Sequence, residues 1–196
     1  MNQDYARVIE RRRDGLQADL QRILADQSNF LWEVGCGHGH FLTAYAAAHP
    51  EKLCIGIDRA SERIGRAVRK RDRARNTNFH FLRADAMLFL QALPATARIS
   101  DLFILFPDPW PKSRHHKHRI LQPDFLTAVA ACAAPGCRLY FRTDHQPYFE
   151  DARSTIAASS AWELETAPWP FEFETVFQRR ARQHDSLVAR IRSPPP

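Results

Sequence analysis

Short apolar runs alternate with amphipathic segments from residue 30 onward, and this alternation predicts the secondary structure. Runs of four to eight apolar residues are typical of buried strands, and the segments between them place apolar side chains at helical spacing. We expect strands at 30–34, 53–57, 79–82, 99–106 and 138–142, and helices at 41–48, 61–75, 87–93, 122–134 and 148–159. Because strands that alternate with helices form parallel sheets, the pattern predicts an α/β fold with helices on both faces of the sheet.

The two ends of the chain depart from this alternation. Residues 5–26 carry a partial apolar stripe among charges, which predicts a helical extension over residues 1–29. Residues 162–192 predict two further strands that pair antiparallel at an edge, and the prolines of 193–196 predict a disordered tail. A length of 196 residues suits a single domain over 1–196.

Composition indicates an ordinary soluble globular protein, with 44% apolar and 26% charged residues. The chain has no apolar run near the ~18 residues of a membrane span and no signal-like N-terminus, so we expect no membrane contact and a cytoplasmic location. Its four cysteines lack the spacing of a zinc site or a disulfide framework, which indicates reduced thiols. The sequence is compatible with a monomer or a homodimer.

Positive charge is concentrated in two places. The formal net charge is +6, and residues 59–75 hold eight Arg or Lys against Glu62 and Asp72, while residues 112–119 contain no acid. Solvated helix faces account for part of this charge, but two separate basic clusters favour a long anionic partner such as RNA.

A glycine-rich loop follows the first strand, reading Glu33-Val-Gly35-Cys-Gly37-His-Gly39. Glycines at this place let the backbone approach a ligand and turn into the next helix. The spacing is G-x-G-x-G, not the G-x-G-x-x-G of dinucleotide folds, and this favours S-adenosylmethionine over a pyrophosphate. A plain glycine-rich turn is the alternative.

Carboxylates end the first three strands. Asp58 can accept hydrogen bonds from ribose hydroxyls, and Asp85 from an adenine amino group. Each could instead be a helix N-cap, a position that Asp favours. Since the carboxyl ends of parallel strands share one edge, Glu33, Asp58 and Asp85 are expected to converge on one cofactor crevice.

The segment 106–119 reads Phe-Pro-Asp-Pro-Trp-Pro-Lys-Ser-Arg-His-His-Lys-His-Arg and follows the fourth strand. Three prolines fix the shape of a turn that carries Asp108 and Trp110. The basic run that follows suits a polyphosphate backbone, with a solvated surface loop as the alternative. Trp110 could stack on a base or pack beneath the loop. His115, His116 and His118 do not predict a metal site, because neighbouring cations would repel a metal ion and no acid lies close in sequence.

Taken in order, these motifs resemble those of the bacterial tRNA (guanine(46)-N(7))-methyltransferases. The resemblance covers about residues 30 to 190 and includes Gly56-Ile-Asp58, Ala84-Asp85-Ala86, Arg142-Thr-Asp144 and Thr175-Val-Phe177-Gln178. It implies a Rossmann-like S-adenosylmethionine-dependent methyltransferase fold, with a seven-stranded, mostly parallel sheet and one antiparallel edge strand. Gln178 stands where the family motif has glutamate, so it can accept a hydrogen bond but supplies no charge.

The resemblance also implies roles for individual residues. Cofactor contacts are implied for Glu33, Gly35, Gly37, Gly39, Asp58, Asp85 and Asp108. Contacts to the substrate nucleotide are implied for Lys112, Asp144, Thr175, Phe177 and Gln178, and contacts to tRNA for Arg114, His115, His116, Lys117, His118 and Arg119.

Guanine N7 carries a lone pair and no proton, so its methylation requires alignment and electrostatics more than a base. Asp108 is the expected catalytic residue, because its carboxylate can stabilise the charge that reaches the purine. Three alternatives remain: a methyltransferase for another RNA or substrate, an RNA-binding relative with weak catalysis, and a nicotinamide oxidoreductase. The glycine spacing disfavours the last.

Overall fold

The computed structural model describes residues 3–74, 77–173 and 183–192. Among these residues the strands are β1 (Asn29–Val34), β2 (Cys54–Asp58), β3 (Phe79–Arg83), β4 (Arg98–Leu105), β5 (Ala133–Thr143), β6 (Trp162–Glu165) and β7 (Asp185–Ile191). The helices are α1 (Gln3–Ile23), α2 (His40–Ala48), α3 (Ser61–Arg73), α4 (Ala86–Ala92), α5 (Pro123–Cys132) and α6 (Gln146–Ala157). Each strand and helix predicted from the sequence is present, and a 3-10 helix, η1 (Ser113–His118), was not predicted.

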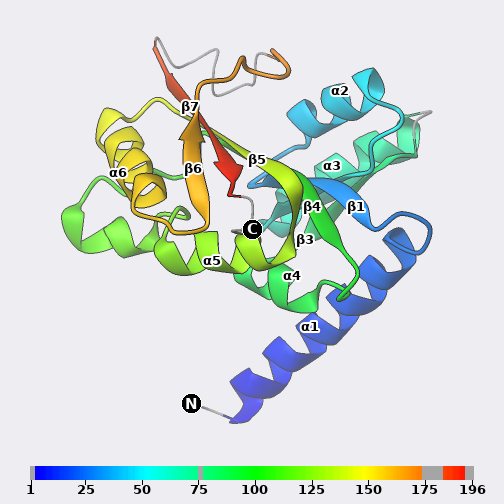
Figure 1. Cartoon of the computed structure of the whole chain (residues 1–196). Helices are drawn as coiled ribbons and strands as arrows, with labels where there is room; N and C mark the ends of the chain where they lie inside the picture. The colour runs from blue at the N-terminus through cyan, green and yellow to red at the C-terminus, as the bar shows by residue number, and fades with distance from the viewer. Residues whose placement is uncertain (1–2, 75–76, 174–182, 193–196) are drawn as a thin grey trace.

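The strands form one seven-stranded sheet in the order β3-β2-β1-β4-β5-β7-β6 (Figure 1). Strands β1 to β5 run parallel, and β7 runs antiparallel to both of its neighbours. The predicted fold class is therefore confirmed. The antiparallel strand β7 lies one place in from the edge, which β6 occupies.

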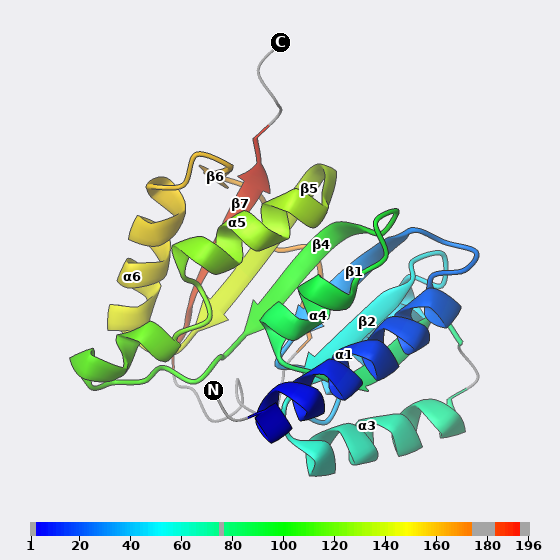
Figure 2. The same ribbon diagram turned by 90° about the horizontal axis from the view of Figure 1, so that it is seen from below.

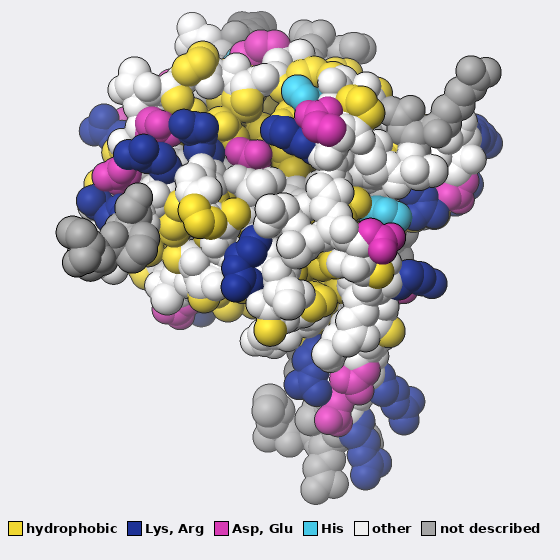
Figure 3. Space-filling view, turned by 45° about the vertical axis from the view of Figure 1, so that its right-hand side comes forward, with side chains coloured by type: hydrophobic (Ala, Val, Ile, Leu, Met, Phe, Trp, Pro, Cys, Tyr) yellow, Lys and Arg dark blue, Asp and Glu magenta, His cyan; other side chains and the backbone are white. Residues whose placement is uncertain are grey.

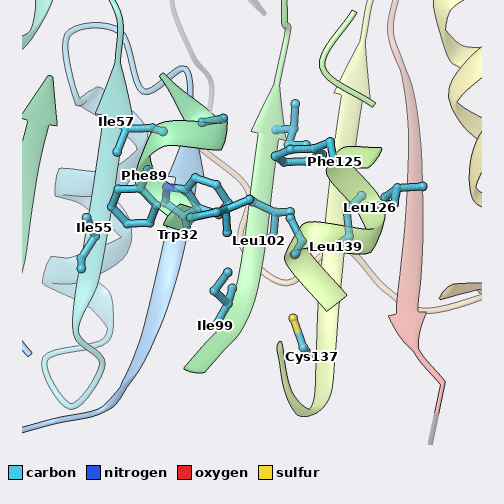
Figure 4. Packing of buried hydrophobic residues seen from close by; sticks show 14 of the residues in the cluster. Trp32, Ile55, Ile57, Phe89, Ile99, Leu102, Phe125, Leu126, Cys137 and Leu139 are labelled. Atoms are coloured by element: carbon cyan, nitrogen blue, oxygen red, sulfur yellow. The ribbon is translucent and has the colours of Figure 1, made fainter. Parts of the chain in front are cut away.

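Alternate side chains along each strand enter two cores on opposite faces of the sheet, as the period of two requires. Trp32 lies on the face covered by α1, α4, α5 and α6, where it stacks on Phe89 with ring centroids 4.7 Å apart (Figures 2 and 4). Phe103 lies on the other face, stacked on Tyr140, in the core formed with α2, α3 and the segment 167–173.

The predicted N-terminal extension is only partly peripheral. Leu16, Leu20 and Leu24 of its second half are buried in the first core, while Val8 in the first half is exposed. Helix α1 is therefore attached to the body through its C-terminal turns, and its N-terminal turns project outward (Figure 1).

All four cysteines are free thiols, and three of them are buried. None of the described helices is long and apolar enough to span a membrane. The predicted disordered tail, 193–196, lies outside the described residues.

Candidate active site

The carboxyl ends of β1 to β5 lie at one edge of the sheet and carry the candidate residues. Backbone hydrogen bonds join the loops that leave these strands: Gly35 N donates to Ile57 O at 2.9 Å, Ala84 N to Asp58 O at 3.2 Å, and Phe106 N to Arg142 O at 2.8 Å. These bonds join the ends of β1, β2 and β3 to one another and the end of β4 to that of β5, and β1 pairs with β4 up to Val34 and Ile104. The ends of β1 to β5 thus form one rim, as expected for parallel strands.

The glycine loop requires its glycines for conformation and for space. Gly35, Gly37 and Gly39 have φ of 77°, 54° and 69°, in the left-handed region. A Cβ on Gly39 would lie 2.3 Å from the ring of Phe81, so only glycine fits between the loop and β3. A Cβ on Gly35 or Gly37 would meet no described atom within 4 Å, which leaves open space in front of the loop for a ligand.

Lys70 of α3 attaches the glycine loop to that helix. Its Nζ donates to His38 O at 3.0 Å and lies 2.9 Å from His40 Nδ1, and burial lowers the pKa of Lys70. Sequence reasoning missed this residue, because a lysine in a basic helix gives no sign of a contact 32 residues earlier.

Glu33 is a buried carboxyl group near the end of β1, with only 4% of its surface exposed. Burial raises its pKa to about 8; a hydrogen bond from the Leu42 backbone lowers the pKa, and the nearby Asp58 raises it. Its Oε2 is buried and has no partner among the described residues. An orphaned acceptor of this kind indicates a group that binds there.

Asp58 connects two parts of the rim. Its Oδ1 accepts from Ala60 N at 2.8 Å, and its Oδ2 accepts from Gly37 N at 3.1 Å and lies 3.6 Å from Arg63 Nη1. Each carboxylate oxygen has two lone pairs, so both can accept a further hydrogen bond from a ligand.

Asp85 is the N-cap of α4. Its Oδ1 accepts from Met87 N at 3.0 Å, which realises the capping alternative that the sequence left open. The side chain is exposed, and the described residues offer its second oxygen no partner. Capping and ligand binding are thus compatible at this position.

The turn after β4 has a strained backbone. Phe106 and Trp110 have φ of 49° and 46°, and they are the non-glycine residues with positive φ in the described part of the chain. Both precede a proline, which disfavours the right-handed helical region for them. Strain of this kind is retained where a local shape matters, and here it presents Asp108 as an exposed side chain at the rim.

The basic run folds into η1 directly after this turn. Lys112, Arg114 and Lys117 are exposed and have no carboxylate partner among the described residues. The histidines are engaged locally: Trp110 lies against His115 and His118, with ring centroids 5.9 and 5.0 Å apart, and His116 Nδ1 lies 3.4 Å from Asp151 Oδ2. Trp110 is half-buried and packs against these two histidines, and its stacking on a base stays a prediction.

Arg119 is a correction to the sequence prediction. We expected it to contact RNA, but its side chain is 1% exposed and lies against α6. It donates to Pro109 O at 2.9 Å, pairs with Asp151 and stacks on the Tyr148 ring at 4.7 Å. A guanidinium buried in this way supports the turn and is not available to a phosphate.

A second arginine is buried beside Asp144. Arg142 forms a bidentate pair with Glu172, both distances being 3.1 Å, donates to Ser186 Oγ at 2.9 Å, and lies 3.9 Å from the Trp169 ring centroid. The pairing lowers the pKa of Glu172. This cluster fixes segment 167–173 against β5 and leaves Asp144 exposed at the rim.

Comparison with known proteins places this rim in a family. The family model "Methyltransf_4", described as "Putative methyltransferase", matches residues 27–185. The chain is 34% identical over 179 residues to the tRNA (guanine-N(7)-)-methyltransferase of Alkalilimnicola ehrlichii, covering 88% of this chain and 75% of that protein. The chain belongs to the tRNA (guanine-N7)-methyltransferase family.

Other relatives with the same name are similar over a smaller share of their length. The chain is 36% identical to the protein of Treponema pallidum, and the match covers 80% of this chain and 63% of the relative. It is also 36% identical to the protein of Nitrosomonas europaea, where the match covers 66% of this chain and 58% of the relative. The match therefore spans roughly half to three quarters of these relatives.

Solved structures support the fold. The antibiotic-resistance methyltransferase Kmr is 26% identical with a TM-score of 0.57, covering 89% of this chain and 93% of that one. The 16S rRNA methyltransferase KamB is 20% identical with a TM-score of 0.64, covering 90% and 94%. A further neighbour, a 16S rRNA (adenine(1408)-N(1))-methyltransferase from Catenulisporales acidiphilia, was solved with S-adenosylmethionine as cosubstrate, at 19% identity and a TM-score of 0.62, covering 91% of this chain and 92% of that one.

The rim of this family member suits S-adenosylmethionine, the predicted cofactor. The open space before Gly35 and Gly37, the orphaned Oε2 of Glu33 and the free acceptor capacity of Asp58 and Asp85 match a ligand with an ammonium group, ribose hydroxyls and an adenine amino group. Family membership and these features together support the cofactor.

Some predicted residues cannot be placed. Thr175, Phe177 and Gln178 lie in 174–182, outside the described residues, so their contacts to a substrate nucleotide stay predictions. Within the described part of the chain, no group of three or more His, Cys, Asp and Glu side chains could hold a metal ion.

Proposed function

We propose that this chain transfers the methyl group of S-adenosylmethionine to N7 of a guanine in tRNA, at position 46 of the variable loop. One observation carries the proposal: the strained turn with Asp108 lies on the same rim as the glycine loop, and exposed cations of η1 follow it directly. The relatives' shared name, tRNA (guanine-N(7)-)-methyltransferase, gives the reaction class.

The cofactor would be held by residues of three strand ends. Glu33 and the backbone of Gly35, Gly37 and Gly39 would face its methionine part, Asp58 its ribose and Asp85 its adenine. When bound, S-adenosylmethionine supplies a sulfonium methyl group that a nucleophile can displace in line. The protein's part is to align the guanine and to exclude water.

Asp108 is the proposed catalytic residue. Guanine N7 needs no deprotonation, so the transferred charge on the purine is the main electrostatic demand. An ionised carboxylate accepts hydrogen bonds only, so Asp108 and Asp144 can bind guanine N–H donors from two sides while stabilising that charge. Asp108 also borders the cofactor by the family resemblance. Thr175, Phe177 and Gln178 complete the nucleotide contacts in this proposal.

The RNA backbone would lie over η1. Lys112 would contact the substrate nucleotide, and Arg114 and Lys117 neighbouring phosphates. His115 and His118 pack against Trp110, and His116 lies near Asp151; all three would contribute to this RNA surface, His118 as an exposed side chain. We further propose that residues 1–196 act as one domain in the cytoplasm, as a monomer or a homodimer.

The test is methylation of purified tRNA with labelled S-adenosylmethionine, followed by nucleoside analysis. We expect 7-methylguanosine as the labelled product, and loss of the label when G46 of a transcript is replaced by adenine. Another labelled nucleoside would overturn the reaction, and labelling that survives the replacement would overturn the position.

A further inference from the structure

A groove of about 1150 Å³ lies between α1 and the start of α4, where β3 ends. Five arginines line it: Arg11, Arg12 and Arg13 from α1, and Arg59 and Arg83 from the ends of β2 and β3. Figure 3 shows dark blue side chains gathered on the part of α1 that projects from the body. The glycine loop and the Asp108 turn do not line this groove.

Positive charge exceeds negative charge along this groove. Arg11, Arg12, Arg59 and Arg83 have no carboxylate partner among the described residues. Arg13 has two, because its Nη2 lies 3.9 Å from Glu10 Oε1 and 3.5 Å from Asp14 Oδ1. Three acids also line the groove: Glu10 lies 3.9 Å from Arg13, Asp19 pairs with Arg22, and Asp85 caps α4 through one of its two oxygens. Five arginines against three acids leave the lining with a net positive charge. The groove therefore attracts anions.

Part of the lining of the groove is apolar. Leu82, Met87 and Leu88 line it, and Met87 is one of the few large apolar side chains that are exposed, at 36%. Arginine forks and apolar side chains in one groove fit a nucleotide, because its phosphate takes bidentate hydrogen bonds and its sugar or base covers apolar surface. A small inorganic anion would use the arginines alone.

The groove is close to the proposed reaction site. Its lining includes Asp85, the proposed adenine ligand, and Arg59, which directly follows the proposed ribose ligand Asp58. Strand β3 is three places from β4 in the sheet, and three strand spacings of ~4.8 Å give about 14 Å. A folded RNA bound over the Asp108 turn can therefore extend along the protein surface to the groove.

We propose that this groove is a second surface for the tRNA backbone, on the opposite side of the cofactor crevice from η1. The proposal rests on the proposed function, since it assigns a further contact to the same RNA substrate. Binding from two sides would hold the tRNA across the rim while one guanine enters it. Contacts made by both surfaces would each contribute to the salt dependence of binding.

The test is tRNA binding by the full chain with Arg11→Gln and Arg12→Gln together, measured between 50 and 200 mM salt. Both side chains are exposed and unpaired, so thermal stability should be unchanged. We expect about tenfold weaker tRNA binding and a salt slope lower by roughly 1.4 to 1.8, with S-adenosylmethionine affinity intact. The control, Arg153→Gln with Arg190→Gln, removes the same charge from paired arginines of α6 and β7 and should leave binding as in the wild type.

Two outcomes would overturn the proposal. One is wild-type tRNA affinity and slope in the α1 variant; the other is a changed oligomeric state with unchanged RNA binding, which would make the groove a protein interface. Failure of the proposed function is distinct from both, because wild-type chain would then form no 7-methylguanosine in the same tRNA.

Discussion

Arg119 Nε donates a hydrogen bond to the carbonyl oxygen of Pro109 at 2.9 Å, and this bond joins the end of η1 to the turn that carries Asp108. The same guanidinium pairs with Asp151 and stacks on Tyr148 of α6. The turn is therefore fixed from below by a buried cation, and Asp108 has a supported position above it.

Arg119→Lys should lower the turnover number while it leaves the salt dependence of tRNA binding unchanged. A lysine keeps the charge but lacks the fork and the planar face that contact Pro109 and Tyr148 together. We expect about a ten- to hundredfold loss in kcat, because a small shift of Asp108 misaligns the reacting guanine. Single-turnover kinetics and a salt titration of tRNA binding check this. A flatter salt slope with normal turnover would contradict it and show that Arg119 contacts RNA.

Arg114→Ala with Lys117→Ala should have the opposite effect. Both side chains are exposed on η1, and phosphate contacts release counterions when they form. Two lost contacts should lower the salt slope by roughly 1.4, weaken tRNA binding, and leave the turnover number at saturating tRNA near the wild-type value. An unchanged slope would identify these side chains as a solvated surface.

The raised pKa of Glu33 predicts that cofactor affinity and the stability of the free protein change with pH in opposite directions. Its carboxyl has a pKa of about 8 in the folded chain because burial opposes ionisation, against 4.5 when unfolded. Between these values the unfolded state has released a proton that the folded state keeps, so the stability of the free protein falls as the pH rises from about 4.5 to 8. Glu33→Gln should remove this fall.

A bound cation favours the ionised form of Glu33, so S-adenosylmethionine binding should tighten from pH 6 to pH 8 and release protons. Calorimetry in two buffers of different ionisation enthalpy measures that release. Glu33→Gln is the control and should bind without it. Equal proton release by the wild type and the variant would show that a group other than Glu33 ionises on binding.

Asp108→Asn tests the proposed catalytic carboxylate. The variant keeps the size and one acceptor oxygen but loses the charge, so we expect a loss of about a hundredfold in kcat with S-adenosylmethionine affinity little changed. The side chain is exposed, so thermal stability should stay at the wild-type value. Normal turnover at saturating tRNA would show that Asp108 takes no part in methyl transfer.

The sequence predicted the sheet because its signals are local. Apolar runs such as 99–106 and helix stops such as Pro50 follow from the residues themselves, and the observed strand and helix ends differ by a few residues. The convergence of Glu33, Asp58 and Asp85 followed from topology, since parallel strands end at one edge.

What the sequence could not predict depends on distant partners. The charge of Arg119 suggested a contact to RNA. In the structure its side chain instead binds Asp151 and Tyr148 of α6, about thirty residues later in the chain. The contacts of Arg142 and Lys70 were likewise not predicted, because their partners lie 30 and 32 residues away. The groove under α1 depends on how that helix crosses α4, which no local pattern specifies.

The most direct test of the central claim replaces the acceptor atom. A tRNA transcript made with 7-deazaguanosine in place of guanosine has carbon at position 7 and keeps every Watson–Crick donor and acceptor. Incubated with the wild-type chain and labelled S-adenosylmethionine, an ordinary transcript should take up the methyl group and the 7-deaza transcript should take up none, although the latter should still compete for binding. Methyl transfer to the 7-deaza transcript at the rate of the ordinary one would contradict guanine N7 as the acceptor.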